Sequence, residues 1–268
     1  MPDDPIPYWQ ALTGPEAGRF GRRDPVLVLP LAAIEQHGPH LPLSTDADIG
    51  RGLLRRAITR LPPDFPVRVL PLLPIGASTE HAHPELAGTL HVESDDLAAV
   101  IVRIGAALAE DGIRRLVLSN SHGGNRHAME IAGLRLRREH GLLVVKATYF
   151  GFERPPDVDL PEAEWRHGLH GGAIETAMML HLHPERVRTE QVTRFASLGE
   201  ELEAAGSRIL PEGPAAFAWM AGDLNPGGAT GDAGLATSEM GRRLVECYGD
   251  RLAAIIRDAL AFPLDRLA

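Results

Sequence analysis

The sequence predicts an α/β fold in which a mostly parallel sheet lies between two layers of helices. Short apolar segments of strand length alternate with longer segments of helical periodicity, as expected for parallel strands joined by helical crossovers. Polar, glycine-containing loops follow several of the apolar segments. No linker and no internal repeat divides the 268 residues, so we expect a single domain over residues 1–268.

The first part of the chain contains the predicted sheet. Apolar runs predict buried strands at 26–33, 67–73, 116–118 and 142–148. Helical spacing and the stop signals Pro62, Gly112 and Gly141 predict helices at 46–61, 94–112 and 125–140, with a loop at 76–93. Ser94 and the Ser44, Thr45 and Asp46 segment are candidate helix N-caps.

The last third is less regular. We expect a helix over 171–182, which ends before Pro184, and a long helix over 236–260. The long helix has an apolar face made of Leu244, Tyr248, Leu252, Ile255 and Ile256. Residues 186–233 are rich in Gly, Pro and Ala and show no clear period, so we assign them no element.

Composition excludes several classes of protein. The net charge of -9 argues against a nucleic-acid partner, and Arg135, Arg137 and Arg138 are interpreted as the solvated face of a helix. The single cysteine, Cys247, excludes a disulfide framework and favours a buried structural thiol. No apolar run is long enough to span a membrane, and the acidic start differs from a signal peptide. We therefore expect a cytoplasmic protein without a membrane partner.

Four polar residues are predicted to meet at the carboxyl edge of the sheet. Glu35 and His37 follow the first strand, Asp46 begins the next helix, and His122 follows a separate strand. Loops at this edge of a parallel sheet converge on one crevice. Residues i and i+2 of an extended segment point the same way, so Glu35 and His37 can reach one ion or two adjacent ions.

This set of side chains favours a divalent transition metal. Imidazole and carboxylate without thiolate suit zinc, manganese or iron(II). Each residue alone would more often belong to an ordinary polar surface loop, but together with Gly123 and Gly124 the set indicates a metal site. The two glycines would allow close backbone approach or a positive φ, and would leave the next helix N-terminus open to an anionic group.

A second cluster lies in the segment HGLHGGAIET. Glu175 begins a helix opened by two glycines, where a carboxylate could reach a ligand or merely stabilise the helix dipole; we favour the ligand. His170 is a candidate proton shuttle, since imidazole titrates near neutral pH. In the loop before the third helix, His81 could line the site, while His83 and His91 are weaker candidates.

The remaining histidines and specificity residues are assigned more simply. His40, beside Pro39, is a candidate partner of a metal ligand. Phe150, Arg166 and the irregular region 187–223 are expected to shape specificity. Four histidines are interpreted as structural or exposed: His127, His140, His181 and His183.

In its motifs the chain resembles the creatininase (creatinine amidohydrolase) family. The resemblance runs in order through PLAAIEQHGPHLPLSTD, GASTEH, AGTLH, LVLSNSHGGN, HGGAIETAMML and GDAGLATSEMGRRL. The first motif is specific, and the order of the others supports it. The resemblance implies a three-layer creatininase-like fold, a homo-oligomer of hexamer size and a dinuclear metal site. It also implies that Glu35, His37, Asp46 and His122 are ligands, with Asp46 bridging the two ions.

The chain departs from creatininase itself in two places. Creatininase has a glutamate ligand two residues after the histidine of the middle motif, where this chain has Gly124, so we expect Glu175 to complete the second site. The tryptophans that line the creatinine pocket are missing, and Phe150 and Arg166 lie near the corresponding places. Creatinine is therefore a poor candidate substrate. The HGGN form resembles the mycofactocin precursor peptidase and formamide hydrolase branches, and GASTEH leans towards the peptidase.

We expect a metal-dependent amidohydrolase with two divalent ions per subunit, Zn, Mn or Fe(II), which hydrolyses a C–N bond of a small amide, cyclic or open. A metal-activated water would attack the carbonyl, and His170 would protonate the departing nitrogen. Glu175 is the second candidate catalytic residue. Substrate contacts are expected from His81, Gly123, Gly124, Phe150 and Arg166.

Two alternatives stay open. One is a metallopeptidase that cleaves a short peptide. The other is a metal-binding protein without catalytic activity, against which the number of converging polar groups speaks.

Overall fold

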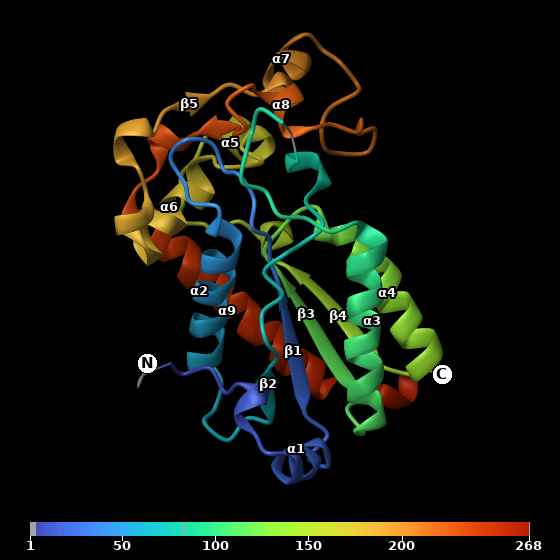
Figure 1. The fold of residues 1–268 in the computed structure, drawn as a ribbon. Helices are drawn as coiled ribbons and strands as arrows, with labels where there is room; N and C mark the ends of the chain where they lie inside the picture. Colours follow the sequence, from blue (N-terminus) through green and yellow to red (C-terminus); the bar gives the residue numbers. More distant parts are fainter. Residues whose placement is uncertain (1–3, 83, 268) are drawn as a thin grey trace.

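The computed structural model describes residues 4–82 and 84–267. Its main sheet has four parallel strands in the order β2–β1–β3–β4 (Figure 1). These strands are β1 (Val26–Leu31), β2 (Val67–Val69), β3 (Arg115–Asn120) and β4 (Leu143–Thr148). The helices that pack on the sheet are α2 (Thr45–Thr59), α3 (Ser94–Glu110), α4 (Asn125–His140) and α9 (Ser238–Ala261). The predicted α/β fold with a parallel sheet is confirmed.

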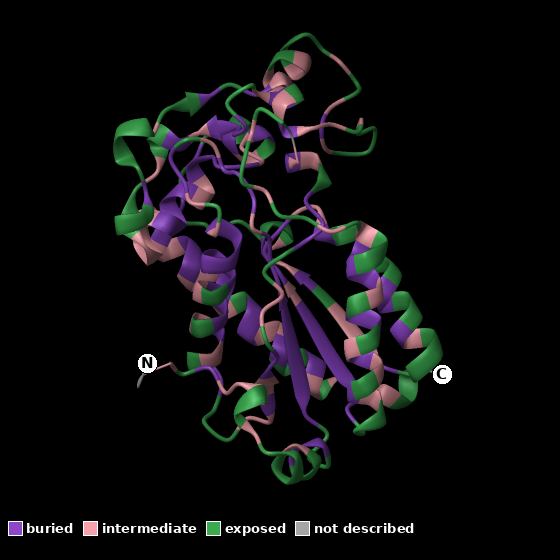
Figure 2. Cartoon of the chain, in the orientation of Figure 1, coloured by how far each residue is buried: buried purple, intermediate pink, exposed green. Residues whose placement is uncertain are grey.

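Each face of the sheet has its own apolar layer. Successive side chains of a strand point to opposite faces. Leu27, Leu29 and Leu31 of β1 therefore pack with α3 and α4, whereas Val26 and Val28 pack with α2 and α9. Because both faces are covered, every residue of β1 is buried, and the strands of the sheet are mostly buried while the outer helix faces are exposed (Figure 2). The arrangement is the three-layer architecture predicted from the sequence.

A second group of short elements lies beyond the carboxyl ends of the strands, opposite α1 (Gly14–Gly21), which lies near their amino ends (Figure 1). It contains α5 (Glu162–His167), α6 (Ala173–Leu182), α7 (Leu198–Ala204), α8 (Ala221–Leu224) and the antiparallel pair β5 (Arg194–Phe195) and β6 (Gly231–Asp232). Four of these elements lie in the region 186–233, to which no helix or strand was assigned from the sequence: α7, α8, β5 and β6. The group covers the edge of the sheet where the polar motifs meet.

Several predicted boundaries need correction. The strand predicted at 67–73 ends at Val69, because Pro71 has no N–H for the ladder, and pairing resumes only as a bridge between Leu31 and Leu73. The helix predicted from residue 171 begins at Ala173, since Gly171 has a φ of 66°. The loop at 76–93 contains a 3₁₀ turn, Thr79–His81.

The helix caps also differ from expectation. Glu93, rather than Ser94, occupies the N-cap position of α3. Ser44 is at the N-cap position of α2, but its hydroxyl donates to Asp48 instead of accepting from the helix backbone. Asp46 lies inside the first turn of α2 and not at its N-cap, and its side chain belongs to the site described below.

The composition-based predictions are partly confirmed. Arg135 and Arg138 are exposed on α4 and Arg137 is half-buried, as expected for a solvated helix face. Cys247 lies in α9 but is only half-buried, so the prediction of a buried thiol is wrong. Among the described residues, no helix has the length and apolar character needed to cross a membrane.

Helices α6 and α9 approach each other tightly at Gly241. A Cβ placed on this residue would lie 1.8 Å from the backbone oxygen of Ala177, so only glycine allows the two helices to approach this far. Helix α6 carries Glu175 on its first turn. The packing of α9 therefore helps to set the position of one candidate ligand.

Gly241→Ala is expected to lower the free energy of unfolding by about 2 kcal/mol or more, because the new methyl group meets backbone that cannot rotate away. Gly222→Ala in α8 is the matched control, since a Cβ there has no neighbour within 4 Å. Chemical denaturation of both variants measures the difference. Equal stability of the two variants would contradict this account of the helix contact.

Candidate metal centre

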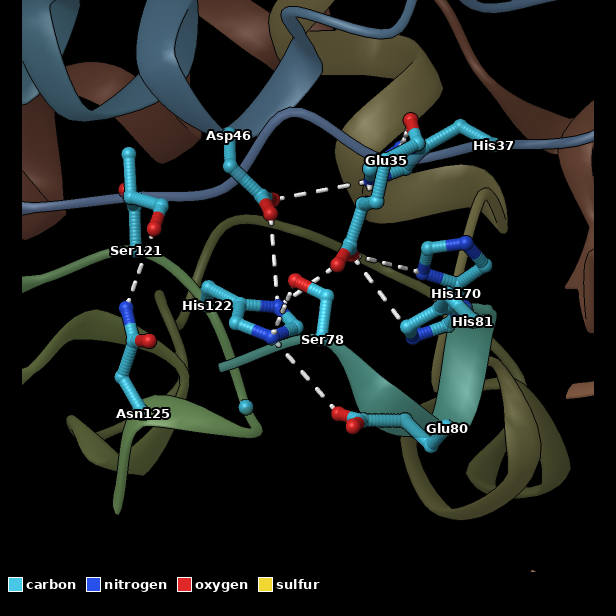
Figure 3. A network of polar contacts seen from close by, with 12 residues as sticks. Glu35, His37, Asp46, Ser78, Glu80, His81, Ser121, His122, Asn125 and His170 are labelled. Atoms are coloured by element: carbon cyan, nitrogen blue, oxygen red, sulfur yellow. Dashed lines mark hydrogen bonds and ion pairs between the residues drawn. The ribbon is translucent and has the colours of Figure 1, made fainter. Parts of the chain in front are cut away.

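The four residues singled out in the sequence lie together at the carboxyl edge of the sheet (Figure 3). Glu35 and His37 lie on the loop that leaves β1, Asp46 on the first turn of α2, and His122 directly after β3. Their relative exposures are 1%, 1%, 2% and 3%. Such a density of buried ionisable groups is costly unless a partner compensates them.

Three overlapping sets of donor atoms are close enough together to hold an ion: Glu35, His37 and His170, and two groups that share Asp46. His122 Nδ1 lies 3.2 Å from Glu35 Oε1 and 3.4 Å from Asp46 Oδ2. His37 Nε2 lies 3.5 Å from Asp46 Oδ1 and 3.7 Å from Glu175 Oε2. Four ligands at tetrahedral positions around zinc are about 3.4 Å from each other. Each group therefore has the spacing of ligands around a single ion, and Asp46 offers a different oxygen to each group.

Unsatisfied polar atoms support the same interpretation. Glu35 Oε2, His37 Nε2 and Asp46 Oδ2 are buried and have no hydrogen-bond partner among the described residues. Buried polar atoms in folded proteins are nearly always satisfied, so three unsatisfied ones in one cluster need an explanation. Divalent cations bound by these residues would compensate the three atoms, and the donor set therefore fits a metal.

The proton positions on the two imidazoles are suited to metal binding. His37 Nδ1 lies 3.1 Å from the backbone oxygen of Glu35, and His122 Nε2 lies 3.0 Å from that of Ala77. A carbonyl oxygen only accepts, so each of these nitrogens carries the proton. The opposite nitrogen of each ring faces the carboxylates, and once it has lost its proton it can ligate a metal.

Electrostatics in the cluster follow from burial and close opposite charges. Burial raises the pKa of Glu35 to about 7. Burial alone would lower the pKa of His37, but Asp46 and the other nearby carboxylates raise it to about 9. Burial would likewise raise the pKa of Asp46, yet His122 and His37 hold it below its usual range. In the absence of a cation, protons on the imidazoles thus balance the carboxylates.

Glu175 lies where the sequence argument placed it. Its carboxylate accepts hydrogen bonds from the backbone N–H of Gly171 at 2.7 Å and from the Tyr149 hydroxyl at 3.4 Å. Its side chain is 14% exposed, more than the other members of the cluster. One oxygen of the Glu175 carboxylate thus faces His37 and Asp46. These two residues belong to the second predicted metal site, which Gly124 leaves without a ligand.

Gly124 is required for close approach and not for a positive φ. Its φ is -62°, but a Cβ there would lie 2.0 Å from the Ala77 oxygen and 2.4 Å from Glu80 Oε1. Gly123 has open space around its Cα. Of the two explanations offered for this pair of glycines, close approach holds for Gly124 alone. The Glu80 carboxylate, which the sequence argument did not single out, lies 3.6 Å from His122 Nε2.

His170 and His81 border the cluster on the side of Glu35. His170 Nδ1 and His81 Nε2 lie 3.7 Å and 3.6 Å from Glu35 Oε1 (Figure 3). Burial, together with neighbouring imidazoles, lowers the pKa of both rings well below its usual value, so both are neutral near pH 7. Of the weaker candidates, His91 is exposed and His83 lies outside the described residues.

His40 contacts the turn before α6 and not a member of the cluster directly. Its Nε2 lies 3.0 Å from both the Gly171 oxygen and the Thr176 hydroxyl. It therefore ties the first motif to the segment that carries Glu175. The four histidines interpreted as structural or exposed are half-buried or exposed: His127, His140, His181 and His183.

The two predicted specificity residues have different surroundings. Phe150 is 44% exposed and its ring contacts Tyr149, the hydroxyl partner of Glu175. The Arg126 guanidinium lies 5.9 Å from the Phe150 ring, and its Nε donates to the Gly123 oxygen. These residues border the cluster. Arg166, in contrast, forms ion pairs with Glu162 and Glu203 on the surface, and the structure does not bring it to the metal ligands.

One residue missed from the sequence holds the second motif in place. Glu164 is buried and accepts hydrogen bonds from the backbone N–H groups of Ala173 and Asp232 at 2.7 and 2.6 Å. Side chains at three surrounding positions would approach its Oε1 within 2.4 to 2.6 Å, which explains Gly168, Gly172 and Gly231. Glu164 thus anchors the start of α6. In the sequence, the only sign of this role is the number of glycines in the segments that surround Glu164.

Comparison with known proteins decides the family. The family model described as creatininase, creatinine amidohydrolase, matches residues 10–256. The chain belongs to the creatininase family. As a member, it is a metal-dependent amidohydrolase that acts on carbon–nitrogen bonds.

Curated relatives include mycofactocin precursor peptide peptidases and a creatinine amidohydrolase. A mycofactocin precursor peptide peptidase of Mycobacterium tuberculosis is 34% identical over 192 residues, 69% of this chain and 70% of that protein. The protein of the same name from Mycobacterium ulcerans is 32% identical over 247 residues, 87% of this chain and 85% of its own. A creatinine amidohydrolase of Pseudomonas putida is 31% identical over 188 residues, 65% of this chain and 70% of that protein.

Solved creatininase structures share the fold. A crystal structure of creatinine amidohydrolase aligns with a TM-score of 0.74 at 26% identity, over 96% of this chain and 98% of that one. A manganese form of creatininase also aligns with a TM-score of 0.74 at 26% identity, over 94% of this chain and 98% of that one. The three-layer creatininase-like fold is confirmed.

Metal affinity of the metal-free protein is expected to rise with pH between about 6 and 9. His37, with its pKa raised to about 9, must lose its proton before it can bind an ion, so protons compete with the metal and binding releases them. Each displaced proton strengthens apparent affinity by about tenfold per pH unit. Calorimetric titration with Zn²⁺ in two buffers of different ionisation enthalpy measures the release. The exposed His127→Ala variant should behave as the native protein, and pH-independent binding without proton release would refute the assignment.

Proposed function

We propose that the chain holds two divalent ions, one by Glu35, Asp46 and His122 and the other by His37, Asp46 and Glu175, and hydrolyses an amide bond there. The observation that carries the proposal is the shared Asp46, which presents Oδ1 to one group and Oδ2 to the other. When bound, such ions bring the pKa of a water near neutrality and polarise a carbonyl. Zinc, manganese and iron(II) are the candidate ions.

His170 is placed to transfer the proton that amide hydrolysis requires. Its Nε2 lies 2.6 Å from the backbone oxygen of Gln36 and therefore carries the ring proton. Its Nδ1 lone pair faces Glu35 and can accept a proton from the attacking water. The same proton then passes to the departing nitrogen, so that the carboxylic acid and amine products form with no net change in His170.

The substrate proposal is a small amide, with a short peptide as the second candidate. The burial of the cluster supports a small group at the reacting carbon. The peptide is favoured by the identity to mycofactocin precursor peptide peptidases over up to 87% of this chain. Phe150, Gly123, Gly124 and His81 would contact either substrate. Arg166 would act only at longer range.

We further propose that the protein is a single domain that forms a homo-oligomer in the cytoplasm, a hexamer if it follows its family. Leu134 and Ile131 support the assembly, since they are 72% and 41% exposed about one turn apart on α4. An exposed apolar pair of this kind suits a contact between copies.

Asp46→Ala is expected to lose both ions, whereas Glu175→Gln should lose only one, because Asp46 alone belongs to both groups. Asp48→Asn is the matched control. It removes a second buried carboxylate of α2, which is paired with Arg186 and lies outside the cluster, so two equivalents should stay bound. Elemental analysis of the dialysed proteins gives the stoichiometry. Two equivalents in Asp46→Ala would disprove the bridge.

Removal of metal by EDTA should abolish hydrolysis, and Zn²⁺, Mn²⁺ or Fe²⁺ should restore it, because the nucleophile depends on the ions. The assay uses a panel of lactams, formamides and short peptides. Turnover of peptides alone would favour the second candidate, and turnover of lactams or formamides the first. Full activity of metal-free protein would rule out the proposed function.

A further inference from the structure

Gln36 lies between two candidate ligands, and its own side chain is 5% exposed. Its amide nitrogen donates to the Gly228 oxygen at 2.8 Å, and its amide oxygen accepts from the Gly38 N–H at 3.1 Å. A backbone carbonyl can only accept and a backbone N–H can only donate. The orientation of the Gln36 amide is therefore determined by the backbone on both sides.

This orientation decides where the proton of His81 resides. The Gln36 amide nitrogen lies 3.2 Å from His81 Nδ1 and has a second N–H to donate. His81 Nδ1 must then accept, which leaves the proton of the neutral ring on Nε2. That nitrogen faces Glu35 Oε1 at 3.6 Å, too far for a hydrogen bond of good geometry.

His81 and His170 therefore present opposite groups to the same side of the site. Their ring centroids are 4.0 Å apart, and both contact Gln36. His170 donates to the backbone oxygen of Gln36 and offers a lone pair, whereas His81 accepts from its side chain and offers an N–H. A nitrogen that carries a proton cannot ligate a metal, so His81 is excluded as a ligand through Nε2.

We propose that His81 donates a hydrogen bond to the carbonyl oxygen of the bound amide, and that Gln36 is the positioning residue that holds His81 in this donor form. The inference rests on the proposed amide hydrolysis. Negative charge develops on the carbonyl oxygen during attack on an amide, and a buried, pre-oriented N–H stabilises it more than water does. The 3% exposure of His81 provides such an environment.

The first test is the proton position itself. In zinc-loaded protein labelled with ¹⁵N-histidine, His81 should give the chemical shifts of a neutral ring protonated at Nε2. Gln36→Met, which cannot donate, should lose this preference, whereas Gln191→Glu, at an exposed glutamine, should retain it. A proton on Nδ1, or a zinc-bound Nε2, in the native protein would overturn the inference.

The second test separates donation from metal binding. His81→Leu should keep two zinc ions but lower kcat about 100-fold or more, with a smaller change in KM, because the donor acts on charge that develops in the transition state. His81→Gln can place an N–H near the original Nε2 and should recover at least tenfold. Loss of an ion in His81→Leu, or an unchanged kcat, would overturn the inference.

Failure of the proposed function gives a different result. If the native protein binds no zinc or hydrolyses no amide of the panel, the proposed function is ruled out. The ¹⁵N spectrum of His81, recorded in that case on the protein without zinc, still reports whether Gln36 sets the position of its proton. The two ideas can therefore fail separately.

Discussion

The sharing of one buried carboxylate by two ligand groups is the constraint on which the rest of the structure depends. Asp46 has two oxygens, one near His37 and the other near His122, and both lie where water does not reach. Buried charges are stable only with compensating charge close by. In this protein, three carboxylates and two imidazoles compensate each other only while the imidazoles are protonated. A pair of divalent ions would replace those protons and also compensate the buried polar atoms that have no hydrogen-bond partner among the described residues.

The scaffold meets this constraint by bringing three loops and the start of α2 to one edge of the sheet. Parallel strands put the loops after β1 and β3 side by side, and the first turn of α2 brings Asp46 to them. The third loop, before α6, is held by contacts that do not belong to the sheet: Glu164 anchors the start of the helix, and His40 binds the Gly171 carbonyl. The Glu175 position is thus set by a polar framework built around glycines, in addition to the apolar packing of α6 on α9.

The regular part of the fold could be read from the sequence because it is encoded locally. Helix α4 begins and ends at the predicted residues, since its stop signal, Gly141, is adjacent in sequence. The candidate ligands could be singled out because each lies near the end of a predicted element. The region 186–233 could not be assigned, because long-range contacts hold its short elements: Asp232 binds Glu164, Gly228 binds Gln36, and Glu212 binds Arg126. No local period reports such contacts.

The same limit applies to the roles of individual histidines. Residue type and spacing placed His81 and His170 near the site, but two neutral imidazoles can be a base, a donor or a ligand with equal ease. Their difference arises from one glutamine whose amide is oriented by Gly38 and Gly228, residues 190 positions apart in the chain. Trp219, in the irregular region, adds a similar case, since its ring lies 6.3 Å from that of His81. The irregular region that folds back over the sheet therefore contributes contacts to Gln36 and His81 that the motifs do not report.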